Sequence, residues 1–357
     1  MVIFHRSAGP DDPPLSRLLA DARERLAGYQ GELFRRAGAD RVLVAPGARR
    51  GDRSWGRTLA ELVAAERIRG LVVLGSGAGV RLRLDDARRL VTAASSPVRH
   101  AVTNNRYSSD LCAVSDAATL ADLPPLPGDN ALPRWLEESA GFEVDELPAR
   151  ARLAFDLDSP LDLAILAASA AAFPRPLREF AHEQGLTVPR LDDLRAVAAN
   201  PRRELLVFGR SPSRTMAWLE RNVPCRVRFL AEERGLRAST PLALGAVVST
   251  LPARRRPPRA TLGRLLAAHG PGALADIVGE LADGALIDSR VLLADHLGPE
   301  EDAWPAAGDR FASDLLRTGD VKDRWLRAVT ASAAASPVPI LLGGHTLVGP
   351  GLPLLLR

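Results

Sequence analysis

The sequence has only two cysteines, Cys112 and Cys225, which lie far apart and each within an apolar segment. A disulfide framework requires several cysteines, and a structural zinc site requires closely spaced pairs of ligands; the sequence has neither pattern. We therefore predict two buried free thiols. The six histidines also form no pair at the spacing of metal ligands.

Long apolar runs are missing as well. No stretch of about 18 consecutive apolar residues occurs, so no transmembrane helix is expected. The first residues, MVIFHRSAGPDD, lack the apolar core of a signal peptide. We predict a soluble, cytoplasmic protein without membrane contacts.

Lysine is nearly absent, since Lys322 is the one lysine found among 47 lysines and arginines. A nucleic-acid-binding protein concentrates positive charge on one face, whereas these arginines are spread along the chain among 43 acidic residues. The pattern does not favour nucleic-acid binding. The densest run, residues 254–259, is typical of a solvated linker. Nothing in the sequence indicates the oligomeric state.

The chain of 357 residues exceeds the usual size of a single hydrophobic core, so two domains are expected. Short apolar runs alternate with helical patterns, which is typical of an α/β fold with a mostly parallel sheet and flanking helices. One series of such runs includes strands expected within residues 69–79 and 152–158, and a second series begins at 204–210. We predict α/β domains at residues 1–187 and 188–357.

A glycine-rich turn, Gly75-Ser76-Gly77-Ala-Gly79, follows the clearest predicted strand. Such turns let backbone amides approach phosphates. The dinucleotide-binding pattern GxGxxG would require glycine at Val80, so a Rossmann-type cofactor site is not favoured. Two interpretations remain, a tight turn without a ligand and a nucleotide site of another kind.

Residues 103–114, TNNRYSSDLCAV, concentrate polar side chains just before an apolar run. Amides can recognise the edge of a base, and a guanidinium can pair with phosphate. The alternative is a loop whose asparagines bond neighbouring backbone groups. The candidate substrate-binding residues are Asn104, Asn105, Arg106 and Tyr107, with Asp110 as a candidate acid.

Residues 155–163, FDLDSPLDL, resemble the Asp-Ile-Asp-Thr-Pro-Glu-Asp-Leu segment of MobA-like nucleotidyltransferases, the group that includes the molybdenum-cofactor and phospholactate guanylyltransferases. Residues 70–91 resemble the central strand, metal-binding loop and following helix of the same family. The resemblance covers about residues 1–175. It implies a sheet like that of nucleotide-diphospho-sugar transferases in the first domain, and a nucleotide, with GTP as a candidate, as one ligand.

The resemblance further implies Mg²⁺-dependent nucleotidyl transfer to a small phosphorylated or acidic acceptor. Asp156 and Asp158, expected at the end of a buried strand, would hold the metal ion. Asp162 is expected to cap the turn at Ser159 or to face solvent. The alternative is that all three acids form a helix N-cap cluster. In that case their role is structural.

Two positions depart from the family pattern. Ala78 stands where the family has its first metal-binding aspartate, so Asp110 is our candidate for the missing ligand. The family's glycine-rich nucleotide loop is replaced by HRSAGPDDPP, in which only Arg6, Ser7 and Gly9 could serve. The alternative function is therefore a non-catalytic regulatory protein that binds a nucleotide or another small ligand and has lost the metal site.

Polar residues also follow predicted strands in the second half, where α/β sheets bind ligands. We take these residues as candidates for a second site, although the sequence favours a helix cap or a buried, hydrogen-bonded imidazole as the role of the histidine. The candidates are Asp288, Arg290, Asp309, Arg310 and His345.

Overall fold

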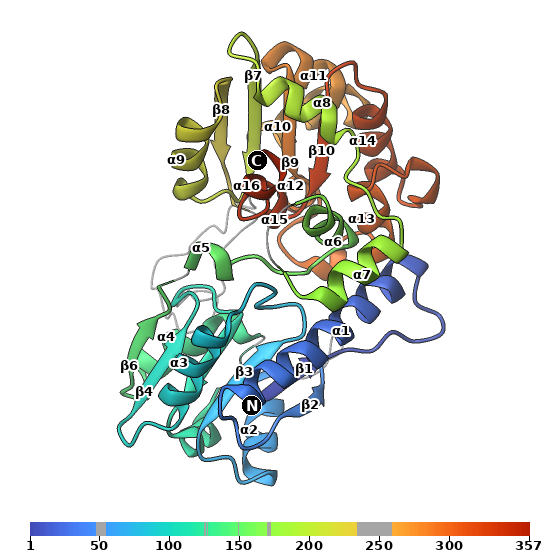
Figure 1. Ribbon diagram of the computed structural model, residues 1–357. Helices are drawn as coiled ribbons and strands as arrows, with labels where there is room; N and C mark the ends of the chain where they lie inside the picture. The colour runs from blue at the N-terminus through green and yellow to red at the C-terminus, as the bar shows by residue number, and fades with distance from the viewer. Residues whose placement is uncertain (48–54, 125, 127, 149, 170–172, 234–258) are drawn as a thin grey trace, which may run out of the picture.

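The computed structural model describes residues 1–47, 55–124, 126, 128–148, 150–169, 173–233 and 259–357. All but the last residue of the expected linker at 254–259 lie outside these ranges. The described chain is α/β, as the sequence predicts, with strands in two sheets flanked by helices (Figure 1). No helix in these ranges has both the length and the apolar character needed to cross a membrane.

The strands fall into two groups along the chain. Sheet A contains β1 (Val2–His5), β2 (Leu43–Pro46), β3 (Leu71–Gly75), β4 (His100–Thr103), β5 (Leu111–Val114) and β6 (Glu143–Glu146). Sheet B contains β7 (Glu204–Gly209), β8 (Arg226–Ala231), β9 (Gly284–Asp288) and β10 (Ile340–Gly343).

The helices connect these strands and cover both sheets. The α-helices of the first half are α1 (Pro14–Arg36), α2 (Trp55–Ala65), α3 (Leu84–Ala94), α4 (Leu132–Glu138), α5 (Arg150–Leu153), α6 (Pro160–Ala167) and α7 (Arg175–Glu183). Those of the second half are α8 (Leu191–Ala198), α9 (Ser213–Asn222), α10 (Thr261–His269), α11 (Leu274–Leu281), α12 (Ser289–Leu297), α13 (Ala307–Asp314), α14 (Arg324–Ala335), α15 (His345–Val348) and α16 (Leu352–Leu355). Short 3-10 helices lie at Ala117–Asp122, Asp129–Ala131, Pro271–Ala273, Glu301–Ala303 and Thr318–Asp320.

Sheet A has the order β2-β1-β3-β5-β4-β6 and is parallel except for β5, which runs antiparallel to β3 and β4. Its apolar runs are buried on both faces. Ile3 packs with α1 and α3, whereas its neighbours Val2 and Phe4 pack with α2 and α4. Strands covered on both sides lose the alternation of apolar and polar residues, and this explains why β3 is a continuous apolar run.

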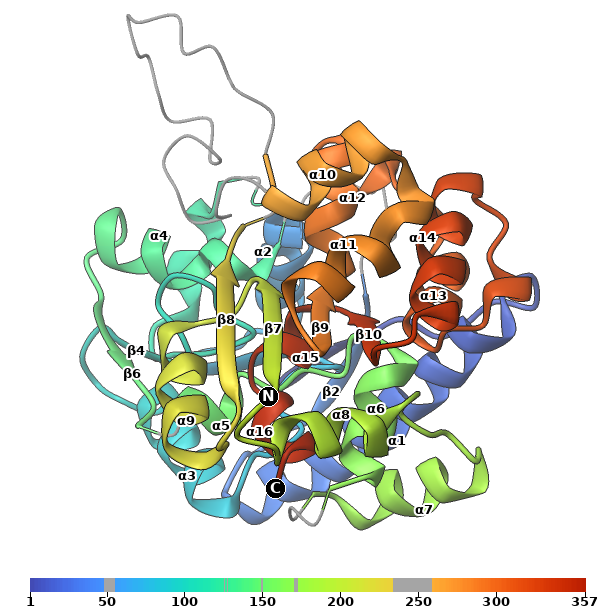
Figure 2. The same ribbon diagram turned by 90° about the horizontal axis from the view of Figure 1, so that it is seen from above.

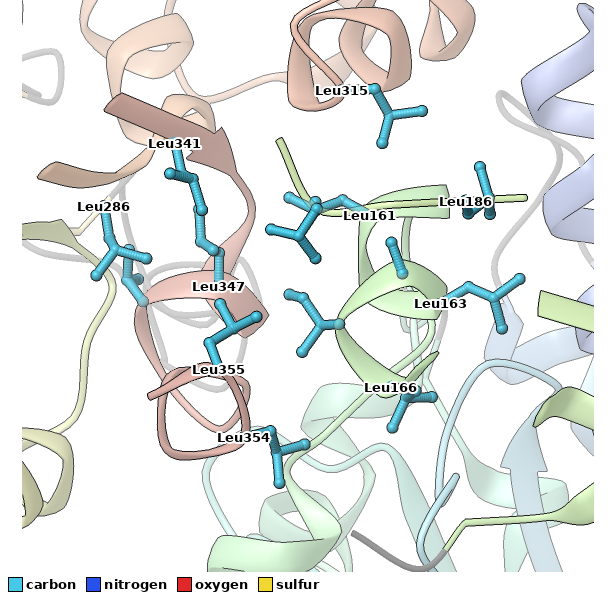
Figure 3. Close-up of a cluster of buried hydrophobic side chains, with 14 of the residues drawn as sticks. Leu161, Leu163, Leu166, Leu186, Leu286, Leu315, Leu341, Leu347, Leu354 and Leu355 are labelled. Carbon is cyan, nitrogen blue, oxygen red and sulfur yellow. The ribbon is translucent and has the colours of Figure 1, made fainter. Parts of the chain in front are cut away.

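Sheet B has the order β10-β9-β7-β8 and is parallel throughout. Seen from above, α10, α11 and α12 lie on one side of the sheet and α8, α9 and α16 on the other (Figure 2). A hydrophobic cluster on one face of sheet B includes Leu161 of α6 together with Leu286 of β9 and Leu341 of β10 (Figure 3). The same cluster includes Leu19 and Leu26 of α1.

The strand expected within residues 152–158 is absent, and this prediction was wrong. Residues 150–153 form α5, and residues 155–158 are extended without belonging to a sheet. Phe155 and Leu157 are fully buried, and they alternate with the more polar Asp156 and Asp158. Phe155 and Leu157 belong to the same hydrophobic cluster. A segment that packs every second side chain against one cluster therefore has the same alternating pattern as a strand.

Candidate functional site

The segment at residues 154–159 lies where the carboxyl ends of strands from both sheets meet. Leu157 N donates a hydrogen bond of 2.8 Å to Gly77 O, in the turn that follows β3. On the other side, His345 begins α15 directly after β10 and reaches Asp156 and Asp158. Figure 1 shows the segment running between the sheets, from α5 to α6. Ligands of α/β proteins bind at such edges.

The glycine-rich turn is shaped by this close approach. A Cβ atom at Gly77 would lie 2.9 Å from both Leu157 O and Arg23 Nε, so a side chain has no room there. Ser76 is buried, and its Oγ lies 3.0 Å from Nδ1 of His5. Gly75 has open space beside it. The turn therefore has a packing role, and of its three candidate residues only Gly75 has free space beside its backbone.

Four aspartates from three separate segments form a cluster, which we call the aspartate cluster: Asp110, Asp129, Asp156 and Asp158. Burial, followed by the charge of Asp129, raises the pKa of Asp110 to about 7. Burial raises the pKa of Asp129 to about 6. Burial, then the charges of Asp110, Asp158 and Asp129, raises the pKa of Asp156 well above its usual range. The carboxylates are thus close enough to disfavour one another's ionisation.

Asp156 is the most buried member of the aspartate cluster, with 7% of its surface exposed. Among the described residues, its Oδ1 atom has no hydrogen-bond partner. Its Oδ2 atom lies 3.8 Å from Nε2 of His345. A buried carboxylate oxygen without a partner is costly, so this atom can accept a hydrogen bond or bind a cation.

Asp158 is more exposed and lies between two basic side chains. Its Oδ1 atom accepts a hydrogen bond of 3.1 Å from the Arg23 guanidinium of α1. Its Oδ2 atom lies 4.0 Å from Nδ1 of His345. The N-terminal and C-terminal halves therefore each place a basic group against this carboxylate.

Asp162 caps α6, one of the two roles expected for it. Its Oδ2 atom accepts hydrogen bonds from Asp158 N, Ser159 N and Ser159 Oγ. Burial nevertheless raises the pKa of Asp162 to about 8. The helix N-cap interpretation thus holds for Asp162. The side chains of Asp156 and Asp158 point to other partners.

The polar stretch at residues 103–114 is partly self-satisfied. Asn104 Nδ2 donates 2.8 Å to Asp110 Oδ2, and Asp110 N donates 3.1 Å to Asn104 Oδ1. Asn105 Oδ1 accepts from Tyr107 N at 3.1 Å. The stretch thus positions Asp110 within the aspartate cluster through Asn104.

Arg106 does not join the aspartate cluster. Its guanidinium lies 3.0 Å from Glu137 of α4 and donates to Val144 O of β6. Its backbone N–H donates 2.7 Å to Glu146. The exposed ring of Tyr107 lies beneath Arg134. The expected phosphate contact of Arg106 would require these bonds to break.

Two of the second-half candidates, Asp288 and Arg290, form ion pairs with residues outside the candidate set. Asp288 pairs with Arg210 at 2.6 Å and caps α12 through Arg290 N. The Arg290 guanidinium bonds both oxygens of Asp314, one of them at 2.6 Å. Asp288, Arg290 and Asp314 are buried, and Arg210 is partly buried. Buried pairs of this kind fix local structure and leave little capacity for a ligand.

Asp309 and Arg310 have contacts of their own on α13. Asp309 Oδ2 accepts hydrogen bonds from Lys322 N at 2.9 Å and Asp323 N at 2.7 Å. Arg310 lies 3.6 Å from Glu301. These contacts hold the segments on either side of α13 against that helix. Of the five candidates, only His345 contacts the aspartate cluster.

An open cleft of about 710 Å³ lies at the carboxyl ends of β1 and β2. It is lined by residues 5–12 and 44–47, and this set includes Arg6, Ser7 and Gly9. His5 lines the cleft and also contacts Ser76 in the glycine turn. The same glycine turn accepts a hydrogen bond from Leu157 N, next to Asp156 and Asp158 of the aspartate cluster. The cleft and the cluster are therefore linked by direct contacts.

No group of three or more His, Cys, Asp or Glu side chains within the described ranges is arranged to hold a metal ion. Mg²⁺ usually takes one or two carboxylates and completes its shell with water and substrate phosphates. The Oδ1 atom of Asp156, which has no hydrogen-bond partner within the described ranges, is an oxygen that could serve as one such carboxylate ligand.

Sequence reasoning missed two residues of this region. Asp129 belongs to the aspartate cluster but follows a proline-rich connection that has no periodic pattern. Arg23 is one of several arginines on a long amphipathic helix, and its contact with Asp158 spans 135 residues of sequence. The prediction of two buried free cysteines is confirmed. No protein-family model, curated protein or solved structure matches this chain.

Proposed function

We propose that this protein binds a nucleoside triphosphate, with GTP as a candidate, and a small phosphorylated or acidic acceptor, and that it transfers the nucleotidyl group with the help of Mg²⁺. The aspartate cluster carries this proposal, above all the buried and unpartnered Oδ1 of Asp156. A divalent cation is the ligand that several mutually repelling carboxylates bind best.

Asp156 would hold the metal together with Asp158 or Asp110. Asp110 is suited to compensate for Ala78, whose side chain is buried and which has no carboxylate to offer. The charge of Asp110 is the largest contribution to the raised pKa of Asp156 after burial. This proximity supports Asp110 as the replacement ligand.

The nucleotide would lie in the cleft at the carboxyl ends of β1 and β2. The volume of about 710 Å³ is within the usual range for pockets that bind small molecules. The cleft offers Arg6 for phosphate contacts and the backbone of the loop at residues 7–10. Gly75, in the glycine-rich turn, has open space where a Cβ atom would stand.

The proposed reaction joins an acceptor oxygen to the α-phosphorus of the nucleotide. The bond between the α-phosphorus and the oxygen bridging to the β-phosphate breaks, and pyrophosphate leaves with that electron pair. Bound Mg²⁺ would supply neutralisation of the phosphate charges. The protein itself would hold the carboxylates, the nucleotide cleft and the acceptor next to one another, so that the reacting groups meet.

The second candidate is a regulatory protein that binds the same ligands without catalysis. The observation that favours it is the absence, among described residues, of a preformed group of three metal ligands. The two candidates differ in whether nucleotide binding depends on the metal ion.

Thermal unfolding with GTP, CTP or ATP, each with and without Mg²⁺, tests the proposal. A ligand at 100 times its Kd stabilises the folded state by about 2.7 kcal/mol, which raises Tm by several degrees. We expect this rise only when Mg²⁺ is present, and we expect Asp156→Asn to abolish it.

Asp192→Asn is the matched control, because its side chain on α8 is 98% exposed. It should respond to Mg²⁺ and nucleotide as the wild type does. Stabilisation that is equal with and without Mg²⁺ would support the regulatory protein, and no stabilisation by any nucleotide would refute both candidates.

A further inference from the structure

Asp158 occupies the position between Arg23 and His345 that an oxyanion of a ligand could take. Arg23 belongs to α1 and His345 to α15, so the two basic groups come from opposite halves of the chain. Arg23 is held in place, because its Nε atom donates 2.7 Å to Leu157 O. The remaining N–H groups of the guanidinium therefore point in a fixed direction, as recognition of an oxyanion requires.

The contact with Asp158 is open to solvent. The Asp158 side chain is 57% exposed, and those of Arg23 and His345 are 30% and 32% exposed. Exposed ion pairs contribute little to stability. Replacing the Asp158 carboxylate with the oxyanion of a ligand therefore costs little free energy. Asp158 is also one of the carboxylates proposed to hold the metal ion. When a metal ion is bound, this side chain can therefore leave Arg23 and His345 and contact the ion instead.

We propose that Arg23 and His345 form a subsite for the phosphate group of the acceptor and that Asp158 fills this subsite when no acceptor is bound. The inference rests on the proposed function for the identity of the ligand as the acceptor. Neither basic residue lines the cleft proposed for the nucleotide. Arg23 borders the turn at Gly77, so the subsite extends from this turn to the C-terminal half.

Calorimetric titration with inorganic phosphate at one fixed pH, with chelator and without nucleotide, tests the subsite. Asp158→Asn removes the competing charge while keeping the side-chain shape. We expect it to bind phosphate about tenfold more tightly than the wild type, which corresponds to about 1.4 kcal/mol. Unchanged affinity would overturn the proposal.

Two further substitutions identify the residues that bind the phosphate. Arg23→Gln and His345→Gln, each added to Asp158→Asn, should each weaken phosphate binding at least tenfold. Arg17→Gln, on the same helix as Arg23, is the matched control and should have no effect. Binding that survives both Arg23→Gln and His345→Gln would overturn the proposal, and because the two variants are independent, one of them remains informative if the other fails to fold.

A last titration separates the subsite from the proposed function. In the wild type, which keeps Asp158, phosphate should bind at least as tightly in the presence of saturating Mg²⁺ and GTP as in their absence. Competition between phosphate and GTP would overturn the assignment to the acceptor. If no nucleotide binds to any variant while phosphate binding still requires Arg23 and His345, the proposed function fails and the oxyanion subsite stands.

Discussion

Replacing Asp110 with asparagine should reduce the dependence of the protein's stability on pH. The pKa of Asp110 is raised from 3.8 to about 7 in the folded protein, first by burial and then by Asp129. The unfolded chain therefore releases this proton at lower pH than the folded chain. The free energy of unfolding consequently falls as pH rises from about 4 to about 7.

The magnitude follows from the part of this window that an experiment covers. From pH 5 to about pH 7, Asp110 keeps its proton in the folded chain but has lost it in the unfolded chain. This window is about two pH units wide, and each unit corresponds to about 1.4 kcal/mol. The full value is therefore about 3 kcal/mol. Solvent reaches part of the Asp110 side chain, so we expect about 1–2 kcal/mol. Asparagine does not ionise. The free energy of unfolding of Asp110→Asn should therefore not show this decrease between pH 5 and pH 8.

Urea unfolding in chelator at pH 5 and pH 8 measures the effect. The wild type should lose about 1–2 kcal/mol more than Asp110→Asn between the two pH values. Asp192→Asn, whose side chain is 98% exposed, should behave as the wild type does. Equal losses in the wild type and Asp110→Asn would refute the clustering of carboxylates on which this reasoning depends.

Three substitutions test the local structure around the site through the free energy of unfolding. Gly77→Ala should destabilise the fold by about 1–3 kcal/mol, because the new Cβ would lie 2.9 Å from Leu157 O. Arg290→Ala should cost about 3–5 kcal/mol, because it leaves the charge of Asp314 buried without its partner; a cost below about 1 kcal/mol would contradict the buried pair. Ser159→Ala removes the N-cap of α6 and should cost about 1 kcal/mol, with the circular dichroism spectrum of the folded state preserved.

The sequence predicted the fold well where the pattern was local. The continuous apolar run of β3 has a signal that depends only on neighbouring residues, and this strand appears as expected. The segment at residues 155–158 was predicted wrongly, because Phe155 and Leu157 pack against one hydrophobic cluster without pairing to a strand. Nothing in the local pattern distinguishes that case from a strand.

The site was predictable only in part, since it is assembled from distant segments. Asp156 and Asp158 were found through a short motif, and Asp110 through its polar surroundings. Asp129 and Arg23 have no such local signal, and the contact of His345 with Asp156 spans 189 positions. The role predicted for Arg106 stays a prediction; in the structure its guanidinium contacts Glu137 and Val144 O, which no local pattern indicates.

Binding of Mn²⁺, measured by electron paramagnetic resonance as a substitute for Mg²⁺, tests the central claim most directly. The wild type should bind the ion more tightly when GTP is present, and Asp156→Asn should weaken this binding at least tenfold while Asp192→Asn leaves it unchanged. Equal Mn²⁺ affinity in the wild type and Asp156→Asn would contradict the proposal that the Asp156 carboxylate, whose Oδ1 has no hydrogen-bond partner among the described residues, holds a cation.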